Sequence, residues 1–88
     1  MSEREVLIVN PLGLHARPAA QIVRAATEFA SDIRLEKDGM EVNGKSIMGV
    51  MMLAAECGST LRIRATGADE NAALDALCRL VSGGFGES

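Results

Sequence analysis

The chain has 88 residues, of which 48% are hydrophobic and 24% charged, and its formal net charge is −3. This length fits one small domain, residues 1–88, with the composition of an ordinary globular protein. The acidic balance and the absence of tryptophan and tyrosine argue against nucleic-acid binding, which favours basic surfaces and aromatic stacking.

The sequence carries no recognisable targeting, membrane or metal-binding motif. Residues 1–5 are charged, and no apolar run is long enough to cross a bilayer. Cys57 and Cys78 are isolated and, with one histidine, are too few to hold a metal. We therefore expect a cytoplasmic protein with reduced thiols, no metal, no cofactor and no membrane insertion.

The first elements are a strand and a helix. Residues 6–9 form a β-branched apolar run that predicts a strand. Residues 16–28 predict a helix with a stripe of small residues at helical spacing, which suits close packing on a sheet. The stripe comprises Ala16, Ala19, Ala20, Val23, Ala26 and Thr27.

A hairpin and a short helix follow. Residues 32–36 alternate between charged and apolar side chains, which predicts a half-exposed strand. Residues 37–39 read as a turn and residues 40–42 as the returning strand. Ser46 then fits the N-cap of a short helix over residues 47–53.

The last elements are another strand and a longer helix. Residues 60–66 alternate apolar with basic or polar side chains and predict a strand. The final helix opens at residues 67–70, with acidic side chains that suit its N-terminus, and ends at Gly83. Residues 85–88 are interpreted as a tail. The apolar face of this helix comprises Ala73, Leu74, Leu77, Cys78 and Val81.

The element order β-α-β-β-α-β-α predicts an α+β fold. We expect an open-faced sandwich, in which a four-stranded, mainly antiparallel sheet is covered on one face by three helices. Such a fold leaves the other face of the sheet to solvent.

The only histidine, His15, lies where a loop becomes a helix. Gly13 permits a close approach of the backbone, and Pro18 suits the first helical turn. The N–H groups of Ala16 and Arg17, with the guanidinium of Arg17, would bind phosphate oxygens at the positive end of the helix. A surface or capping histidine is the structural alternative, but these neighbours favour a nucleophilic imidazole that holds a phosphoryl group covalently.

Two segments of the chain carry a family resemblance. Residues 13–19 read Gly-Leu-His-Ala-Arg-Pro-Ala, and residues 44–51 read Gly-Lys-Ser-Ile-Met-Gly-Val-Met. They resemble the active-site signature and the regulatory-serine region of the HPr family, the histidine phosphocarriers of the bacterial phosphotransferase system. The chain has the family's length and the motifs lie about the usual distance apart, so the resemblance covers essentially all 88 residues.

The resemblance implies the same fold and a carrier rather than an enzyme. His15 would accept a phosphoryl group on Nδ1 from phosphoenolpyruvate-charged enzyme I and pass it to enzyme IIA-type acceptors, as in sugar transport. Such a carrier must stay reactive, so we expect a shallow, exposed site on a monomer, completed by the partner protein.

Ser46 has two interpretations. In the structural interpretation Ser46 is only an N-cap. The resemblance instead implies that Ser46 is phosphorylated by an ATP-dependent HPr kinase/phosphorylase. A phosphate there would suit the helix N-terminus and add negative charge beside neighbouring surface residues. We therefore expect inhibited docking rather than unfolding.

The short helix after Ser46 carries more apolar residues than it can bury. Ile47, Met48 and Met51 are predicted to remain partly exposed as a docking patch, the alternative being that all belong to the core. The resemblance implies that this patch, with Leu14 and Ala20, receives enzyme I and the enzyme IIA-type acceptors.

Two departures from the family pattern and one charged residue leave alternatives open. Residues 12–13 and 82–86 look more like NPr, the nitrogen-related branch of the family, so the downstream acceptor does not follow. Ala54 and Ala55 replace a glycine common in this stretch, which predicts a shifted end of the second helix. Arg24 is most simply a solvated helix charge, with phosphate or partner contact as the alternative.

Two other functions are weighed against the carrier. One is a regulatory interaction protein that acts mainly through phosphorylated Ser46, with a vestigial His15 relay. The other is a small ligand-sensing module unrelated to phosphoryl transfer. The retention of His15 with Arg17 and Pro18 weighs against the first, and the second would need another explanation for both motifs.

Overall fold

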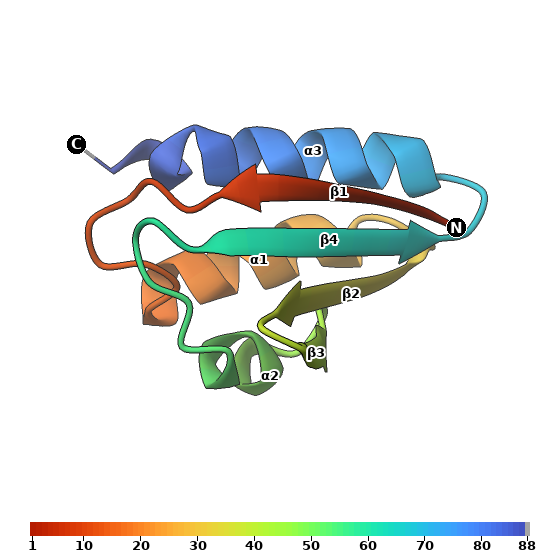
Figure 1. Cartoon of the computed structure of the whole chain (residues 1–88). Helices are drawn as coiled ribbons and strands as arrows, with labels where there is room; N and C mark the ends of the chain where they lie inside the picture. Colours follow the sequence, from red (N-terminus) through yellow and green to blue (C-terminus); the bar gives the residue numbers. More distant parts are fainter. Residues whose placement is uncertain (88) are drawn as a thin grey trace.

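A computed structural model gives the fold and describes residues 1–87 (Figure 1). Its element order confirms the predicted β-α-β-β-α-β-α arrangement and adds a 3-10 turn at the end. The elements are β1 (Ser2–Leu7), α1 (Ala16–Thr27), β2 (Asp32–Lys37), β3 (Met40–Asn43), α2 (Ile47–Met52), β4 (Thr60–Thr66), α3 (Glu70–Ser82) and η1 (Gly84–Gly86).

The four strands form one antiparallel sheet in the order β1-β4-β2-β3, and the three helices cover one of its faces (Figure 1). The central strand β4 shows why the sheet has two different faces. Leu61, Ile63 and Ala65 point into the core, whereas Arg62 and Arg64 alternate with them on the outer face. The α+β open-faced sandwich expected from the sequence is confirmed.

The core lies between the sheet and the helices. In α3 the predicted apolar face is confirmed for Ala73, Leu74, Leu77 and Val81, while Cys78 is partly buried. In α1 the prediction was partly wrong. The buried residues of that helix are Pro18, Ala19, Ile22 and Ala26. Ala16 and Thr27 of the predicted stripe are exposed, because the buried stripe is centred on Ile22, the largest apolar side chain of the helix.

Strand β1 runs earlier than predicted. It spans Ser2–Leu7 rather than residues 6–9, and its six residues pair with β4 from Ala65 to Thr60. The prediction placed the strand too late because Ile8, just beyond the strand, is buried, whereas Glu3 and Glu5 within the strand point outward. An edge strand with a charged outer face gives a weak hydrophobic signal.

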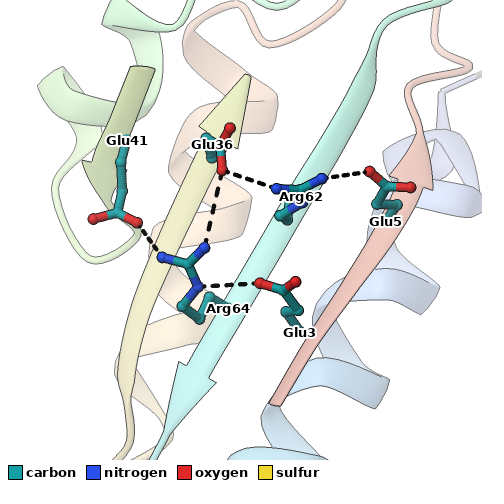
Figure 2. Close-up of polar contacts among 6 residues, drawn as sticks. All are labelled: Glu3, Glu5, Glu36, Glu41, Arg62 and Arg64. Carbon is teal, nitrogen blue, oxygen red and sulfur yellow. Dashed lines mark hydrogen bonds and ion pairs between the residues drawn. The ribbon is translucent and has the colours of Figure 1, made fainter. Parts of the chain in front are cut away.

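Ion pairs cross the outer face of the sheet (Figure 2). The guanidinium of Arg62 lies 3.1 Å from a Glu5 oxygen and 3.4 Å from a Glu36 oxygen. Arg64 lies 3.2 Å from Glu3 and 2.6 Å from Glu41. Each arginine thus joins strands on both sides of β4, and we name these six residues the sheet-face network: Glu3, Glu5, Glu36, Glu41, Arg62 and Arg64.

The end of α2 lies close to its predicted position. The helix ends at Met52, one residue before the predicted end, and Leu53 is its C-cap. Ala54 then adopts a positive φ of 49°, a left-handed conformation that favours glycine. The chain therefore uses an alanine where glycine would be less strained.

The predicted tail is ordered over its described part. Gly84–Gly86 forms a 3-10 turn, and Phe85 is 6% exposed and joins the core. This corrects the expectation of a free tail for residues 85–87, while Ser88 lies outside the described residues. Figure 1 places this C-terminal segment at the end of the molecule where α1 begins.

Within residues 1–87, no helix is long and apolar enough to cross a bilayer. The same residues contain no cluster of three metal-ligating side chains. Cys57 is exposed and Cys78 partly buried, and both are free thiols.

Candidate functional site

The loop before His15 is held tightly against the segment after α2. The Leu14 N–H donates to the Ala55 carbonyl at 2.9 Å. Gly13 has a φ of 65°, and a Cβ there would lie 2.3 Å from the same carbonyl oxygen, so only glycine fits. Leu14 is 4% exposed and belongs to the core, which corrects its expected place on the docking surface.

His15 is the N-cap residue of α1. Its backbone is extended, with φ −75° and ψ −173°, and its carbonyl accepts the first helical hydrogen bond from the Ala19 N–H at 3.0 Å. Ala16 and Arg17 occupy the first turn, where backbone N–H groups have no partner within the helix. The side chain of His15 is 36% exposed, so the imidazole lies at the positive end of α1 and within reach of solvent.

The C-terminal segment contributes a carboxylate to this site. The Glu87 Oε2 atom lies 3.1 Å from His15 Nε2, and the Glu87 side chain is 25% exposed. Its Oε1 atom lies 3.4 Å from the Asn10 side-chain amide, which also donates to the Gly13 carbonyl at 2.7 Å. We call Asn10, His15 and Glu87 the histidine triad.

Sequence reasoning missed Glu87 because nothing local marks it. It is 72 residues from His15 and follows the predicted end of regular structure. The one available signal was Phe85, one of only two phenylalanines, set between two glycines. A large apolar side chain after the last helix indicates that the segment returns to the core.

A hollow of about 450 Å³ opens beside the imidazole. Its lining residues include Arg17 and Gln21 of α1 and Glu87 of the C-terminal segment. A second hollow of about 470 Å³ continues along α1 and is lined by Arg17, Gln21 and Arg24. Within residues 1–87, neither arginine has a carboxylate partner; Arg17 lies in the first turn of α1, beside His15, and Arg24 lies in its last turn.

Helix α2 presents an apolar surface next to α1. Its only buried residue is Val50, and the exposed fractions are 45% for Ile47, 75% for Met48 and 42% for Met51. Met52, which lies outside the predicted patch, is 65% exposed. The alternative that these residues all belong to the core is therefore wrong.

Ser46 caps this helix. Its Oγ accepts a hydrogen bond from the Gly49 N–H at 3.1 Å, as expected for an N-cap. The residue is partly exposed and lies next to Ile47 and Met48 in the chain. A charge added to the Ser46 hydroxyl would therefore stand at the border of the α2 surface.

Comparisons with known proteins agree over almost the whole chain. A family model described as the PTS HPr component phosphorylation site matches residues 2–83. The phosphocarrier protein HPr of Treponema pallidum is 52% identical over 87 residues, which cover 99% of each chain. That of Cupriavidus necator is 47% identical over 87 residues, covering 99% of this chain and 98% of the relative. The crystal structure of HPr-C-His from Thermoanaerobacter tengcongensis is similar with a TM-score of 0.96 and 46% identity, covering 100% of this chain and 99% of that one.

Proposed function

Because this chain belongs to the HPr family, the phosphocarriers of the bacterial phosphotransferase system, we propose that His15 is its phosphoryl-carrying residue. It accepts the group from phosphoenolpyruvate-charged enzyme I and passes it to enzyme IIA-type acceptors. One observation carries the proposal: a partly exposed imidazole stands at the N-cap position of α1 close to Arg17, a guanidinium with no carboxylate partner in residues 1–87.

The geometry suits a carrier better than a catalyst. An exposed imidazole can meet a phosphoryl donor directly, and the first-turn N–H groups of Ala16 and Arg17 provide donors for its oxygens. The Arg17 guanidinium adds a forked donor for the same oxygens. The hollow is open, so the partner protein supplies the remaining groups that stabilise the transition state, and the phosphoryl group stays transferable.

The exposed apolar surface of α2 is proposed as the docking surface for both partners. Ile47, Met48 and Met51 supply it, joined by Ala20 of α1 and by Met52. Methionine side chains adapt to differently shaped partners, which suits a protein that meets a donor and several acceptors in turn. Leu14 supports this surface from the core rather than contacting partners itself.

Ser46 is proposed as a regulatory site for an HPr kinase/phosphorylase. Phosphate there would sit at the N-terminus of α2 and place about −1.5 to −2 charges beside the docking surface. Docking of enzyme I would weaken while the fold persists. The second candidate function, a regulator that acts mainly through phosphorylated Ser46, is favoured by the same position of the hydroxyl at the edge of the exposed methionines.

Two branches of the phosphotransferase system are candidates for this chain. The carrier acts in the cytoplasm as a monomer in this proposal, and its acceptor is either a sugar-transport enzyme IIA or its NPr-type, nitrogen-related counterpart. Competition between the two acceptor classes for the phosphorylated chain would assign the branch.

Intact mass spectrometry tests the carrier function. The chain is incubated with phosphoenolpyruvate, magnesium and enzyme I, beside a His15→Ala variant. An acid-labile gain of about 80 Da, one phosphoryl group, is expected for the native chain and none for the variant. No gain with an enzyme I that phosphorylates another HPr would reject the carrier function and favour the Ser46 regulator.

The Ser46 proposal needs its own measurement. Incubation with an HPr kinase/phosphorylase and ATP should add one acid-stable phosphate, and a Ser46→Ala variant should take none. Subsequent transfer from enzyme I to the serine-phosphorylated chain should be slower. Equal transfer rates would show that phosphate at Ser46 does not control docking.

A further inference from the structure

Every methionine of this chain is exposed at the surface. The exposed fractions are 72% for Met1, 47% for Met40, 75% for Met48, 42% for Met51 and 65% for Met52. The buried core is built instead from leucine, isoleucine, valine, alanine and phenylalanine side chains. Methionine is an adaptable apolar residue that commonly fills gaps in cores, so its placement on the surface needs an explanation.

Three of the five methionines lie together on α2. Met48, Met51 and Met52 stand at positions i, i+3 and i+4, so their side chains share one face of the helix. The helix packs against α1 and β3 and lies at the edge of the molecule (Figure 1), and Val50 is the residue that it buries. The three thioethers therefore belong to side chains that face solvent on the docking surface.

We propose that Met48, Met51 and Met52 form a reversible oxidation site, at which hydrogen peroxide converts the thioethers to sulfoxides and thereby weakens docking of the partner proteins. The effect on docking rests on the function proposed above, whereas the reactivity of the thioethers is a property of the free protein. Methionine oxidation disrupts methionine-rich interfaces by turning an apolar side chain into a polar one.

The oxidation balances with peroxide as the only other reactant. A lone pair of the thioether sulfur attacks one oxygen of hydrogen peroxide, the O–O bond breaks, and its electron pair leaves with the other oxygen. After proton transfer the products are one methionine sulfoxide and one water, so sulfur loses two electrons and peroxide gains two. Methionine sulfoxide reductases reverse the change with a thiol as the reductant, which returns the side chain to its apolar form.

The sulfoxides change the surface of the protein while the fold persists. Met48 and Met52 are more than half exposed, so the added oxygens stay in water in the free protein, and the buried side chain of Val50 is untouched. Docking would instead bury these oxygens against an apolar partner surface, which is unfavourable where no hydrogen-bond donor meets them. Oxidation therefore weakens docking without unfolding the chain.

A triple variant, Met48→Leu with Met51→Leu and Met52→Leu, assigns the effect to α2. Leucine has nearly the volume of methionine and carries no sulfur, and the variant keeps Met1, Met40 and both cysteines. Each chain is compared with its own untreated form, so that any effect of the leucines on docking cancels. Met40→Leu is the matched control, because it removes an exposed methionine from β3 instead of α2.

The first measurement is peptide mass spectrometry of the free chain after treatment with increasing hydrogen peroxide, in which each sulfoxide adds about 16 Da, one oxygen. Met48 and Met52 should be oxidised at the concentrations that oxidise Met1, which has a comparable exposed fraction, and before Met51. The melting temperature should remain that of the untreated chain. If Met48 and Met52 stayed reduced while Met1 was oxidised, or if the chain unfolded as they were oxidised, the proposal would be overturned.

The second measurement is the dissociation constant for enzyme I, from isothermal titration calorimetry before and after peroxide. The native chain and Met40→Leu should bind about 10-fold more weakly after oxidation, because polar oxygens are buried on docking. The triple leucine variant should keep its own untreated affinity, and methionine sulfoxide reductases with a thiol should restore the affinity of the native chain.

Two results would overturn the oxidation site alone. One is an unchanged affinity of the native chain after oxidation, and the other is an equal loss in the triple leucine variant, which would place the sensitive group outside α2. An untreated native chain that did not bind an active enzyme I would instead reject the docking function proposed above, and the effect of oxidation on docking with it.

Discussion

Arginines occur on the outer face of the sheet and along helix α1, in opposite electrostatic surroundings. Arg62 and Arg64 each contact carboxylates from strands on both sides of β4 (Figure 2). Arg17 and Arg24 line the hollows along α1 and have no carboxylate partner in the described chain. The same side chain is therefore neutralised in one region and left available in the other.

The difference has a physical consequence for the two regions. An arginine that already contacts carboxylates has little to gain from an added anion, and surface ion pairs contribute only modestly to stability. An arginine without a partner presents its full charge and its forked donors to an incoming phosphoryl group. The sheet face is thus read as structural, and the end containing His15 and Arg17 as functional.

Matched arginine substitutions test this comparison with the largest expected effect. Arg17→Ala should slow phosphoryl transfer about 10- to 100-fold, because it removes a charge-assisted hydrogen bond to the transferred group. Its melting temperature should hardly change, since the side chain is exposed and unpaired within residues 1–87. Single-turnover transfer from enzyme I and thermal unfolding measure the two quantities.

Arg64→Ala is the opposite case. It breaks pairs with Glu3 and Glu41, so it should lower the unfolding free energy by less than about 1 kcal/mol and leave transfer unchanged. If Arg64→Ala slowed transfer as much as Arg17→Ala, the distinction between a structural and a functional region would be lost.

Apolar side chains allow a second test of the same comparison. Met48 is 75% exposed on α2, and Leu7 is 52% exposed on β1. Met48→Asp should weaken enzyme I binding about 10-fold or more, because it replaces a side chain buried on docking with a charge. Isothermal titration calorimetry would give the dissociation constants.

Leu7→Asp controls for the charge, and we expect it to bind enzyme I as the native chain does. Both variants should keep the native unfolding free energy within about 0.5 kcal/mol. A large loss of stability in Met48→Asp would assign that side chain to the core instead of the docking surface.

The sequence predicted the elements whose hydrophobic pattern is local. Strand β4 was predicted at its observed bounds because Leu61, Ile63 and Ala65 alternate with polar residues on a half-buried strand. The predicted start of α1 at Ala16 was confirmed because a loop glycine and a first-turn proline mark it. The position of His15 at this boundary was therefore predictable as well.

What the sequence did not predict depends on contacts between distant residues. Leu14 is buried because the loop docks on Ala55, and Glu87 reaches His15 because Phe85 returns the chain to the core. Neither contact leaves a periodic pattern, since each is set by one or two residues in irregular structure. The start of β1 was also missed, because the outward-facing Glu3 and Glu5 make residues 2–5 too polar to be recognised as a strand.

A third test uses Asp69, whose carboxylate accepts hydrogen bonds from residues 30–31, just after the end of α1. The Asp69 carboxylate accepts hydrogen bonds from the Ser31 hydroxyl and from the Ala30 N–H at 2.8 Å. These donors, the Ser31 hydroxyl first, lower the pKa of Asp69 below its ordinary value. A lowered folded-state pKa stabilises the protein above the unfolded value, near 3.9, and this contribution is lost as pH falls through the folded value.

Asp69→Asn should therefore unfold at lower urea concentration than the native chain at pH 7, with the gap closing below about pH 4. Asp75→Asn, which removes one exposed pair with Arg4, should show a smaller gap at pH 7. A gap that stayed constant down to pH 2.5 would mean that the carboxylate charge of Asp69 does not stabilise the fold.

The smallest expected effect concerns backbone strain at two residues near the His15 site. Phe85 and Ala54 both have positive φ, but only Phe85 leads to a residue of the histidine triad. If the strain at Ala54 serves no contact, Ala54→Gly should raise the unfolding free energy by about 0.5–1 kcal/mol and leave transfer unchanged.

Ala72→Gly, on the exposed side of α3, is the control and should lower the unfolding free energy by about the same amount, because glycine costs conformational entropy in a helix. Opposite signs for one substitution at two sites would establish that Ala54 is strained. A transfer rate that fell with Ala54→Gly would instead tie this strain to the Gly13 loop, whose position depends on the carbonyl of the next residue, Ala55.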